Sequence, residues 1–265
     1  MSMIDKYNAR AEAVNSLLCV GLDSSLERLP EQFLADEHPQ FAFNKWIIEQ
    51  THEFVAAYKP NIAFYEAQGA QGLIDLQMTM DYLCVEHPDI FTICDAKRAD
   101  IGSTNEAYVT GIFDAMGFDA ITLHPYLGRD ALSPFLQRSD KGCIVLCRTS
   151  NSGARELQDL QIEGKYLWEV VATQVSQEWN SNDNCMLVVG ATYPNEMRVI
   201  REIIGDMTLL VPGIGVQGGN VEQTVTAGLN SHNKGLIINS SRGIIFSENP
   251  RRSAQELRDG INLHR

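Results

Sequence analysis

Two short segments place charged side chains directly behind apolar runs. One such run ends at Asp95, with Lys97 and Asp100 shortly after it. The other is residues 54–61, in which Lys59 is the only charged residue. Asp95 and Lys97 are two residues apart at an expected strand end, so both point to the same face. A lysine buried without a carboxylate would lose its proton or destabilise the fold, so we expect Lys59 to pair with Asp95. The alternatives are a charged surface turn and a lysine that reaches solvent at a strand edge.

A glycine-rich loop, residues 211–220, could bind an anion. Gly213, Gly215 and Gly218 formally match the dinucleotide pattern G-x-G-x-x-G. The loop follows the seventh expected strand rather than the first, and the next strand ends without an acid to hold a ribose. We therefore expect its backbone N–H groups to bind a phosphate, with Arg242 as a bidentate partner. Two ordinary turns and a solvated arginine are the alternative.

Other polar residues end further apolar runs. We expect His124 to be a structural hydrogen-bonding residue, and Ser150 to bind a substrate rather than act as a nucleophile. No histidine cluster or H-E-x-x-H motif indicates a metal site. The complete polar rim comprises Asp23, Lys59, Asn61, Asp95, Lys97, His124, Arg148–Ser150, Thr192, Asn239 and Arg242.

Eight apolar runs must position these groups. Most are continuous rather than alternating, which is typical of parallel strands buried on both faces. They are Leu17–Asp23, Phe54–Asn61, Ile90–Asp95, Ala120–His124, Cys143–Arg148, Met186–Gly190, Thr208–Val211 and Gly235–Asn239. Segments long enough for crossover helices separate them, among them Tyr65–His87, Ser103–Met116, Gly164–Trp179, Asn195–Ile204 and Asn220–Gly228.

This rhythm of strand and helix predicts an α/β fold, a (β/α)₈ TIM barrel in which the polar strand ends share one mouth. No linker divides the chain, so we predict a single domain over residues 1–265, with 1–16 as an N-terminal helical extension. Residues 1–16 and 251–265 are expected to close the barrel ends. Ser103 to Glu106 fits a capping box, and Pro194 suits a first helical turn. An open doubly wound sheet is the alternative.

Composition excludes several classes of protein. With 265 residues and 44% hydrophobic content, the chain is neither disordered nor a small disulfide scaffold. Its net charge of −13 disfavours nucleic acid and anionic membranes. The six cysteines contain no C-x-x-C pair, which indicates free thiols in a reducing compartment. No apolar stretch approaches about 20 residues, so we expect a cytoplasmic protein.

The segment Asp95-Ala-Lys97-Arg-Ala-Asp100-Ile-Gly-Ser-Thr104 resembles the signature of the orotidine 5′-phosphate decarboxylase family, in its longer bacterial subgroup. The resemblance spans nearly the whole chain. It includes Val20–Asp23, Tyr58–Asn61, Leu123–Pro125, Pro212–Gly219 and Ser241–Gly243. It implies a cytoplasmic (β/α)₈ homodimer that converts orotidine 5′-phosphate to UMP and CO₂, the last step of de novo UMP synthesis, without cofactor or metal.

The same resemblance implies roles for individual residues. Lys59, Asp95, Lys97 and Asp100 correspond to an alternating catalytic array, with Asp100 donated to the partner subunit. The substrate contacts it implies are Asp23 and Thr104 to ribose, Gln217 and Arg242 to phosphate, and Ser150 to the pyrimidine. Two departures from shorter members, Ser241 before Arg242 and Gly102 after Ile101, fit the longer subgroup. The alternatives are a sister sugar-phosphate decarboxylase that binds Mg²⁺ and a catalytically silent phosphosugar-binding barrel.

Overall fold

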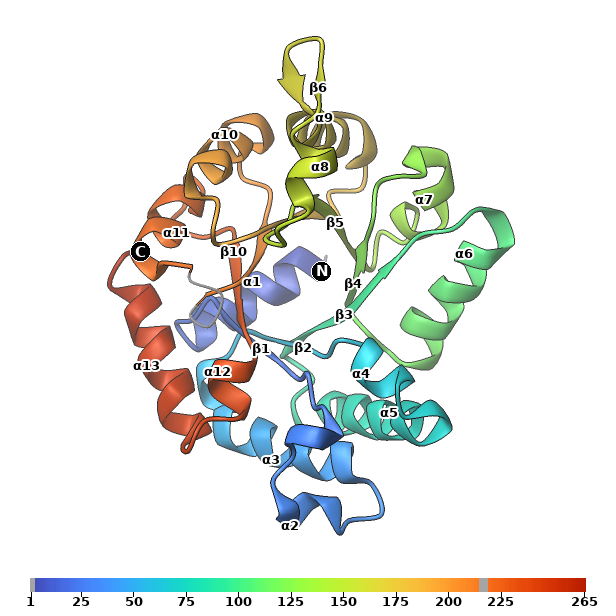
Figure 1. Cartoon of the computed structure of the whole chain (residues 1–265), viewed down its shortest axis with the longest axis vertical. Helices are drawn as coiled ribbons and strands as arrows, with labels where there is room; N and C mark the ends of the chain where they lie inside the picture. The colour runs from blue at the N-terminus through green and yellow to red at the C-terminus, as the bar shows by residue number, and fades with distance from the viewer. Residues whose placement is uncertain (1–2, 215–218) are drawn as a thin grey trace.

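The eight predicted apolar runs form eight parallel strands that close into a barrel in the computed structural model, which describes residues 3–214 and 219–265 (Figure 1). Their order around the barrel is β1-β10-β9-β8-β5-β4-β3-β2. The bounds are β1 Leu18–Gly21, β2 Ala57–Lys59, β3 Phe91–Arg98, β4 Ala120–Leu123, β5 Gly142–Arg148, β8 Cys185–Val189, β9 Leu209–Pro212 and β10 Leu236–Ser240. Because the barrel is closed, the alternative of an open doubly wound sheet is excluded.

An outer ring of eight helices covers the barrel, one following each strand (Figure 1). These are α3 Pro39–Thr51, α5 Gly69–Glu86, α6 Gly102–Val109, α7 Gly128–Leu136, α9 Leu167–Gln174, α10 Pro194–Ile204, α11 Val221–Gly228 and α13 Pro250–Asn262. Helix α1, Met3–Ala13, precedes β1, and short helices lie in the connections: α2 Glu31–Leu34, α4 Ala63–Glu66, α8 Ala154–Gln158 and α12 Arg242–Ile245. Single turns of other helix types are Leu26–Arg28, His52–Phe54, Thr110–Ala115 and Val175–Trp179.

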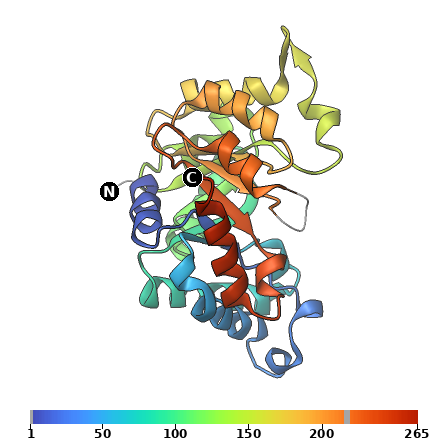
Figure 2. The same ribbon diagram turned by 90° about the vertical axis from the view of Figure 1, so that its left-hand side faces the viewer.

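The two terminal helices differ in position. Helix α1 lies across one end of the barrel (Figure 2), where the Tyr7 hydroxyl donates to the carbonyl of Leu236 and Lys6 pairs with Asp119 at 2.7 Å. Helix α13 packs beside α3, α11 and β1 in the outer ring, so the expectation that residues 251–265 close a barrel end is wrong. The physical reason is that β10 needs its own crossover helix to cover its outer face.

Two local predictions were also wrong. The expected helix Gly164–Trp179 begins later, because Lys165–Tyr166 (β7) pairs with Gln161–Ile162 (β6) in a small antiparallel hairpin. The expected helix Tyr65–His87 is divided into α4 and α5, with Gly69 at a φ of 60° where the chain changes direction. Pro194 does begin α10, as predicted.

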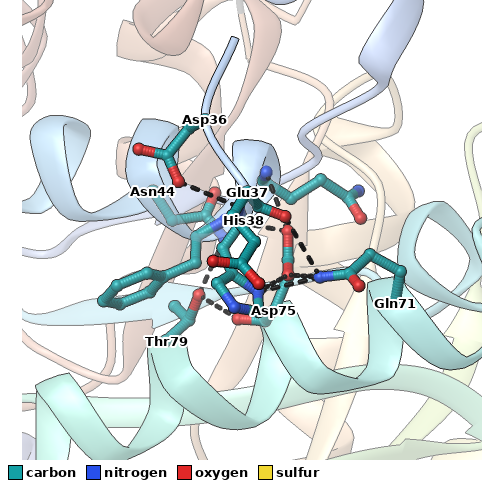
Figure 3. Close-up of polar contacts among 9 residues, drawn as sticks. Asp36, Glu37, His38, Asn44, Gln71, Asp75 and Thr79 are labelled. Atoms are coloured by element: carbon teal, nitrogen blue, oxygen red, sulfur yellow. Dashed lines mark hydrogen bonds and ion pairs between the residues drawn. The ribbon is translucent and has the colours of Figure 1, made fainter. Parts of the chain in front are cut away.

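A buried carboxylate fixes the connection that follows β1 (Figure 3). Asp75 in α5 accepts hydrogen bonds from the Gln40 N–H at 3.0 Å and Gln71 Nε2 at 2.9 Å, and contacts His38 Nδ1 at 2.9 Å. It thereby supplies the N-terminal cap that α3 lacks in its own sequence. The Gln40 side chain then donates to the Ser24 carbonyl at 2.7 Å. This chain of contacts holds the turn next to Asp23 in place.

All six cysteines are free, and five of them are buried. Burial raises the pKa of Cys19 to about 12, so this thiol in β1 is not a thiolate at neutral pH. Across residues 3–214 and 219–265, no helix combines the length and the apolar character that a membrane span requires.

Candidate active site

The polar strand ends converge on a cavity of about 400 Å³ at the carboxyl ends of the barrel strands. This is the end at which barrels of this type gather their functional loops. Its lining comprises Asp23, Lys59, Asn61, Phe64, Asp95, Lys97, Thr122, Leu146, Ser150, Val188, Leu210, Pro212, Gly213, Ile214, Asn239, Ser240, Ser241, Arg242 and Gly243. The lining combines apolar side chains with charged and polar ones, as is usual for a small-molecule site.

Three of the four predicted array members contact one another at this cavity. Lys59 Nζ lies 2.7 Å from Asp95 Oδ2, which confirms the predicted pairing between the neighbouring strands β2 and β3. Lys97 Nζ lies 2.5 Å from Asp95 Oδ1. The side chain of Lys59 is 5% exposed, whereas that of Lys97 is 49% exposed. Lys97 therefore presents the more accessible of the two ammonium groups to a ligand in the cavity.

Lys59 and Asp95 each stabilise the charged form of the other. Burial by itself would raise the pKa of Asp95, but the ammonium groups of Lys59 and Lys97 outweigh it and hold that pKa well below its usual range. Burial would lower the pKa of Lys59, but Asp95 and Asp23 outweigh it and raise that pKa above its usual range. Lys59 and Asp95 are therefore both ionised at neutral pH.

Thr122 of β4 belongs to the site and was missed in the sequence. It lines the cavity and its hydroxyl lies 3.0 Å from Asp95 Oδ1. The sequence does contain one indication of this role, because Thr122 is the only polar residue of the strand Ala120–Leu123. Threonine is so common in strands that this signal is weak without knowledge of the neighbouring strand.

The expected phosphate end of the site contains both predicted segments. Arg242 begins α12 directly after β10, and Gly213 follows β9 on the same cavity wall. The Ser241 hydroxyl donates to the carbonyl of Gly21 at 3.1 Å, which ties this wall to β1. Gln217, also predicted here, lies outside the described residues.

Asp23 and Ser150 line the cavity on opposite walls, after β1 and β5. Asp23 Oδ1 is buried and has no hydrogen-bond partner among the residues that the structure describes, so it can accept a hydrogen bond from a ligand. Gly190 permits the approach of Ser150, because a Cβ at Gly190 would lie 2.9 Å from the Cβ of Ser150.

Asp100 and Thr104 are not among the described residues that line this cavity. The predicted capping box is wrong here: α6 is preceded by Ile101, whose side chain makes no cap, and Ser103 lies within the helix. A buried side chain inside the helix instead holds the backbone that precedes it. Asn105 accepts the N–H of Asp100 at 2.9 Å and donates to the Asp100 carbonyl, which fixes the backbone at Asp100.

Arg148 and His124, two members of the predicted rim, are also not among the described lining residues. Arg148 is 1% exposed and points into a carboxylate cluster, with Asp159 at 2.8 Å and Glu196 at 3.6 Å. Its guanidinium stacks 4.1 Å from the centre of the Tyr193 ring. Arg148 therefore joins β5 to α8 and α10 and does not face a ligand.

No group of three or more His, Cys, Asp and Glu side chains has the arrangement of a metal site in the part of the chain that the structure describes. The described charges at the cavity instead alternate between lysine and aspartate. Such an arrangement can stabilise a negative charge on a bound molecule and supply it with a proton.

Comparisons with known proteins give a consistent result. Residues 16–257 match the model of the family described as orotidine 5′-phosphate decarboxylase / HUMPS. A protein named orotidine 5′-phosphate decarboxylase from Cellvibrio japonicus (strain Ueda107) is 46% identical, with 100% of both chains covered. One from Dechloromonas aromatica (strain RCB) is 45% identical, also with 100% of both covered. The structure of Leishmania donovani OMP decarboxylase is similar with a TM-score of 0.89 and 40% identity, covering 100% of this chain and 99% of that one.

Proposed function

This chain belongs to the orotidine 5′-phosphate decarboxylase / HUMPS family, and from that membership we propose that Lys97 stabilises and then protonates the carbanion formed during decarboxylation. The protein is a carboxy-lyase, and the reaction is the conversion of orotidine 5′-phosphate to UMP and CO₂. The observation that carries the proposal is the contiguous series Lys59–Asp95–Lys97 at the cavity, in which the Lys97 side chain, 49% exposed, is much more accessible than that of Lys59.

The chemistry of the substrate explains why an ammonium is needed. When the C6–carboxylate bond breaks, its electron pair stays on C6 in the plane of the ring, where the π system cannot delocalise it. A fixed positive charge next to C6 lowers the free energy of that state, and the same ammonium then transfers a proton to C6. Lys97 suits both roles, because its side chain is half exposed and its ammonium is held by Asp95 at 2.5 Å.

Asp95 and Lys59 orient this ammonium. Asp95 accepts Lys97 with one oxygen and Lys59 with the other, so rotation of the carboxylate would break two short ion pairs. Their positions are fixed before the substrate arrives, which avoids reorganisation during the reaction. CO₂ leaves as a neutral molecule, so the negative charge stays on C6 until the proton from Lys97 neutralises it.

The remaining contacts hold the nucleotide. Arg242 and the backbone near Gly213 bind the phosphate, together with Gln217. Asp23, whose Oδ1 has no partner within residues 3–214 and 219–265, accepts a hydrogen bond from a ribose hydroxyl. Ser150 donates to the pyrimidine. These contacts lie away from C6 and contribute binding energy that orients the reacting carbon.

The protein acts as a homodimer in which each chain donates Asp100 to the other's site. Three observations support this proposal. Asp100 does not line the cavity of its own chain among the described residues. Asn105 fixes the backbone at Asp100. Ile101, next to Asp100, is 66% exposed, as expected of an apolar side chain that packs against a second copy. The acidic net charge gives no reason to include nucleic acid or membrane among the partners.

Lys59 opposes the alternative of a sister sugar-phosphate decarboxylase. That activity places Mg²⁺ next to a carboxylate of the second strand, where this chain has a buried ammonium. A cation there would meet direct electrostatic repulsion. We expect decarboxylation, followed by the loss of orotidine 5′-phosphate absorbance, to continue unchanged in EDTA; inhibition by EDTA that Mg²⁺ reverses would favour the alternative.

Lys97→Ala tests the proposed proton donor. We expect it to abolish UMP formation while the affinity for UMP changes by less than about ten-fold, because the phosphate and ribose contacts remain. Lys45→Ala is the matched control, since Lys45 is an exposed lysine of α3 whose nearest carboxylate is Glu49 at 4.0 Å. Equal losses of activity and affinity would assign Lys97 a purely structural role.

Subunit mixing tests the shared site. Lys97→Ala and Asp100→Ala subunits are each inactive as homodimers, but a hybrid dimer contains one site with intact Lys97 and intact Asp100. Mixing should therefore restore part of the activity. Absence of recovery after subunit exchange has been verified by mass spectrometry would overturn the donation of Asp100.

A further inference from the structure

The hydroxyl of Thr122 contacts three polar groups of the active site at once. It lies 3.0 Å from the backbone N of Ala96, 2.9 Å from the backbone N of Lys97 and 3.0 Å from Asp95 Oδ1. The residue is 1% exposed, so water does not compete for these contacts. One side chain of β4 thus touches three consecutive residues of β3.

The direction of each hydrogen bond follows from the atoms involved. A hydroxyl has one proton and two acceptor lone pairs, and a backbone N–H can only donate. The N–H groups of Ala96 and Lys97 therefore occupy both lone pairs. The single proton must go to Asp95, which is ionised and can only accept. The hydroxyl of Thr122 has no capacity left for a substrate.

These contacts lie at an irregularity between β3 and β4. Cys94 pairs with Ile121 and Arg98 with Leu123, so β3 has two more residues than β4 between these pairs. Such a bulge interrupts the regular backbone ladder and redirects side chains, often beside active sites. The hydroxyl of Thr122 supplies the acceptor that the N–H groups of Ala96 and Lys97 need within this interruption.

The backbone of Lys97 is unusual at this point. Its φ is 48°, in the left-handed region that residues with a Cβ seldom adopt. This conformation persists only where the surroundings determine it, and the N–H held by Thr122 at 2.9 Å is one such constraint. The direction in which the Lys97 side chain leaves the strand depends on it.

We propose that Thr122 is a positioning residue that fixes the backbone of Lys97 and the carboxylate of Asp95, so that the Lys97 ammonium meets C6 of the substrate. This inference rests on the role proposed above for Lys97. Because the hydroxyl does not bind substrate, its loss slows the chemical step and leaves nucleotide affinity unchanged. A displacement of about 1 Å in a reacting group is sufficient to reduce a rate by about 100-fold.

Thr122→Val is the primary test, since valine has the shape of threonine without the hydroxyl. We expect kcat to fall by about 100-fold while KM and the affinity for UMP stay within about three-fold. Thr122→Ser, which retains the hydroxyl, should recover kcat to within about five-fold of the unmodified enzyme. If Thr122→Val does not fold, Thr122→Ala removes the same hydroxyl and is compared with Thr122→Ser in its place.

Thr92→Val is the matched control. Thr92 is a buried threonine of β3 at the other end of the barrel, and its hydroxyl exchanges hydrogen bonds of 3.1 Å with Asp119. This variant should lose thermal stability and keep its kcat. A loss of kcat equal to that of Thr122→Val would show that any buried threonine of the barrel has this effect, and would overturn the positioning role.

Two further results would overturn it: a kcat of Thr122→Val within about three-fold of the unmodified enzyme, or a Thr122→Ser variant as slow as Thr122→Val. Lys97→Ala, measured alongside, separates the two proposals. If Lys97→Ala is inactive and Thr122→Val is normal, only the positioning inference fails. If Lys97→Ala retains activity, the proposed proton donor is wrong whatever Thr122→Val does.

Discussion

Removal of Asp95 should leave the buried Lys59 ammonium without its carboxylate and so destabilise the protein. Substitution of Lys59 as well should then restore part of the lost stability. In Asp95→Asn the Lys59 ammonium, 5% exposed, loses its carboxylate at 2.7 Å. Removal of one partner of a buried ion pair costs about 3–5 kcal/mol, and because Asp23 still stabilises the ammonium we expect about 3 kcal/mol. Lys59→Met leaves Asp95 with Lys97 and Thr122, so its cost should be smaller, about 2 kcal/mol.

The double variant distinguishes this reasoning from simple additivity. Asp95→Asn with Lys59→Met removes both buried charges, and an apolar chain of similar length fills the space of the lysine. We expect it to be more stable than Asp95→Asn alone by about 1–2 kcal/mol. The measurement is the free energy of unfolding from urea titrations, followed by the fluorescence of the three tryptophans.

The ion pair between Lys6 and Asp119 provides the control. Its length is also 2.7 Å, but the Lys6 side chain is 23% exposed, so the ammonium left by Asp119→Asn can be hydrated. Lys6→Met should not increase the stability of Asp119→Asn. If Lys59→Met likewise brings no gain to Asp95→Asn, then Lys59 is not an uncompensated buried charge and the reasoning is refuted.

Three more predictions concern pH, the α8 segment and α3. The pKa of Asp95 is lower in the folded state than the ordinary value of about 3.9. The ionised carboxylate therefore stabilises the fold fully above about pH 5, and this stabilisation is lost as the pH falls below about 4. Urea titrations should show that the unmodified protein loses stability over this range and that Asp95→Asn loses less. Arg148→Met should cost about 2 kcal/mol and accelerate limited proteolysis at residues 154–166, because α8 loses its ion pair with β5; an unchanged cleavage rate would contradict this. Asp75→Ala leaves the α3 N–H groups without a cap and should cost about 2–3 kcal/mol, measured as a lower unfolding midpoint, whereas exposed Asp81→Ala should have little effect.

The barrel was predictable because its strands are buried on both faces and therefore appear as continuous apolar runs. The pairing of Lys59 with Asp95 was predictable for a related reason: a buried ammonium needs a carboxylate, and the neighbouring strand offered one. Both inferences use constraints that a short stretch of sequence carries by itself.

The missed features depend on residues distant in the sequence. Ser103 has the local pattern of a cap but lies inside α6, where Asn105 contacts the backbone of Asp100 and the Ala131 carbonyl of α7. Arg148 has the sequence position of a rim residue, but carboxylates from two later segments draw it away from the cavity. Thr122 acquires its role only from a bulge in the neighbouring strand.

The pairing of β1 with β10 has a consequence for synthesis of the chain. Leu18 pairs with Ile238, and Asp23 shares its cavity with Arg242, so the first and last strands must both be present before the site exists. A nascent chain released before residue 242 lacks the closing strand or Arg242, the residue proposed to bind the phosphate. Decarboxylation therefore requires the completed barrel, and activity cannot return after dilution from denaturant until the first and last strands have met.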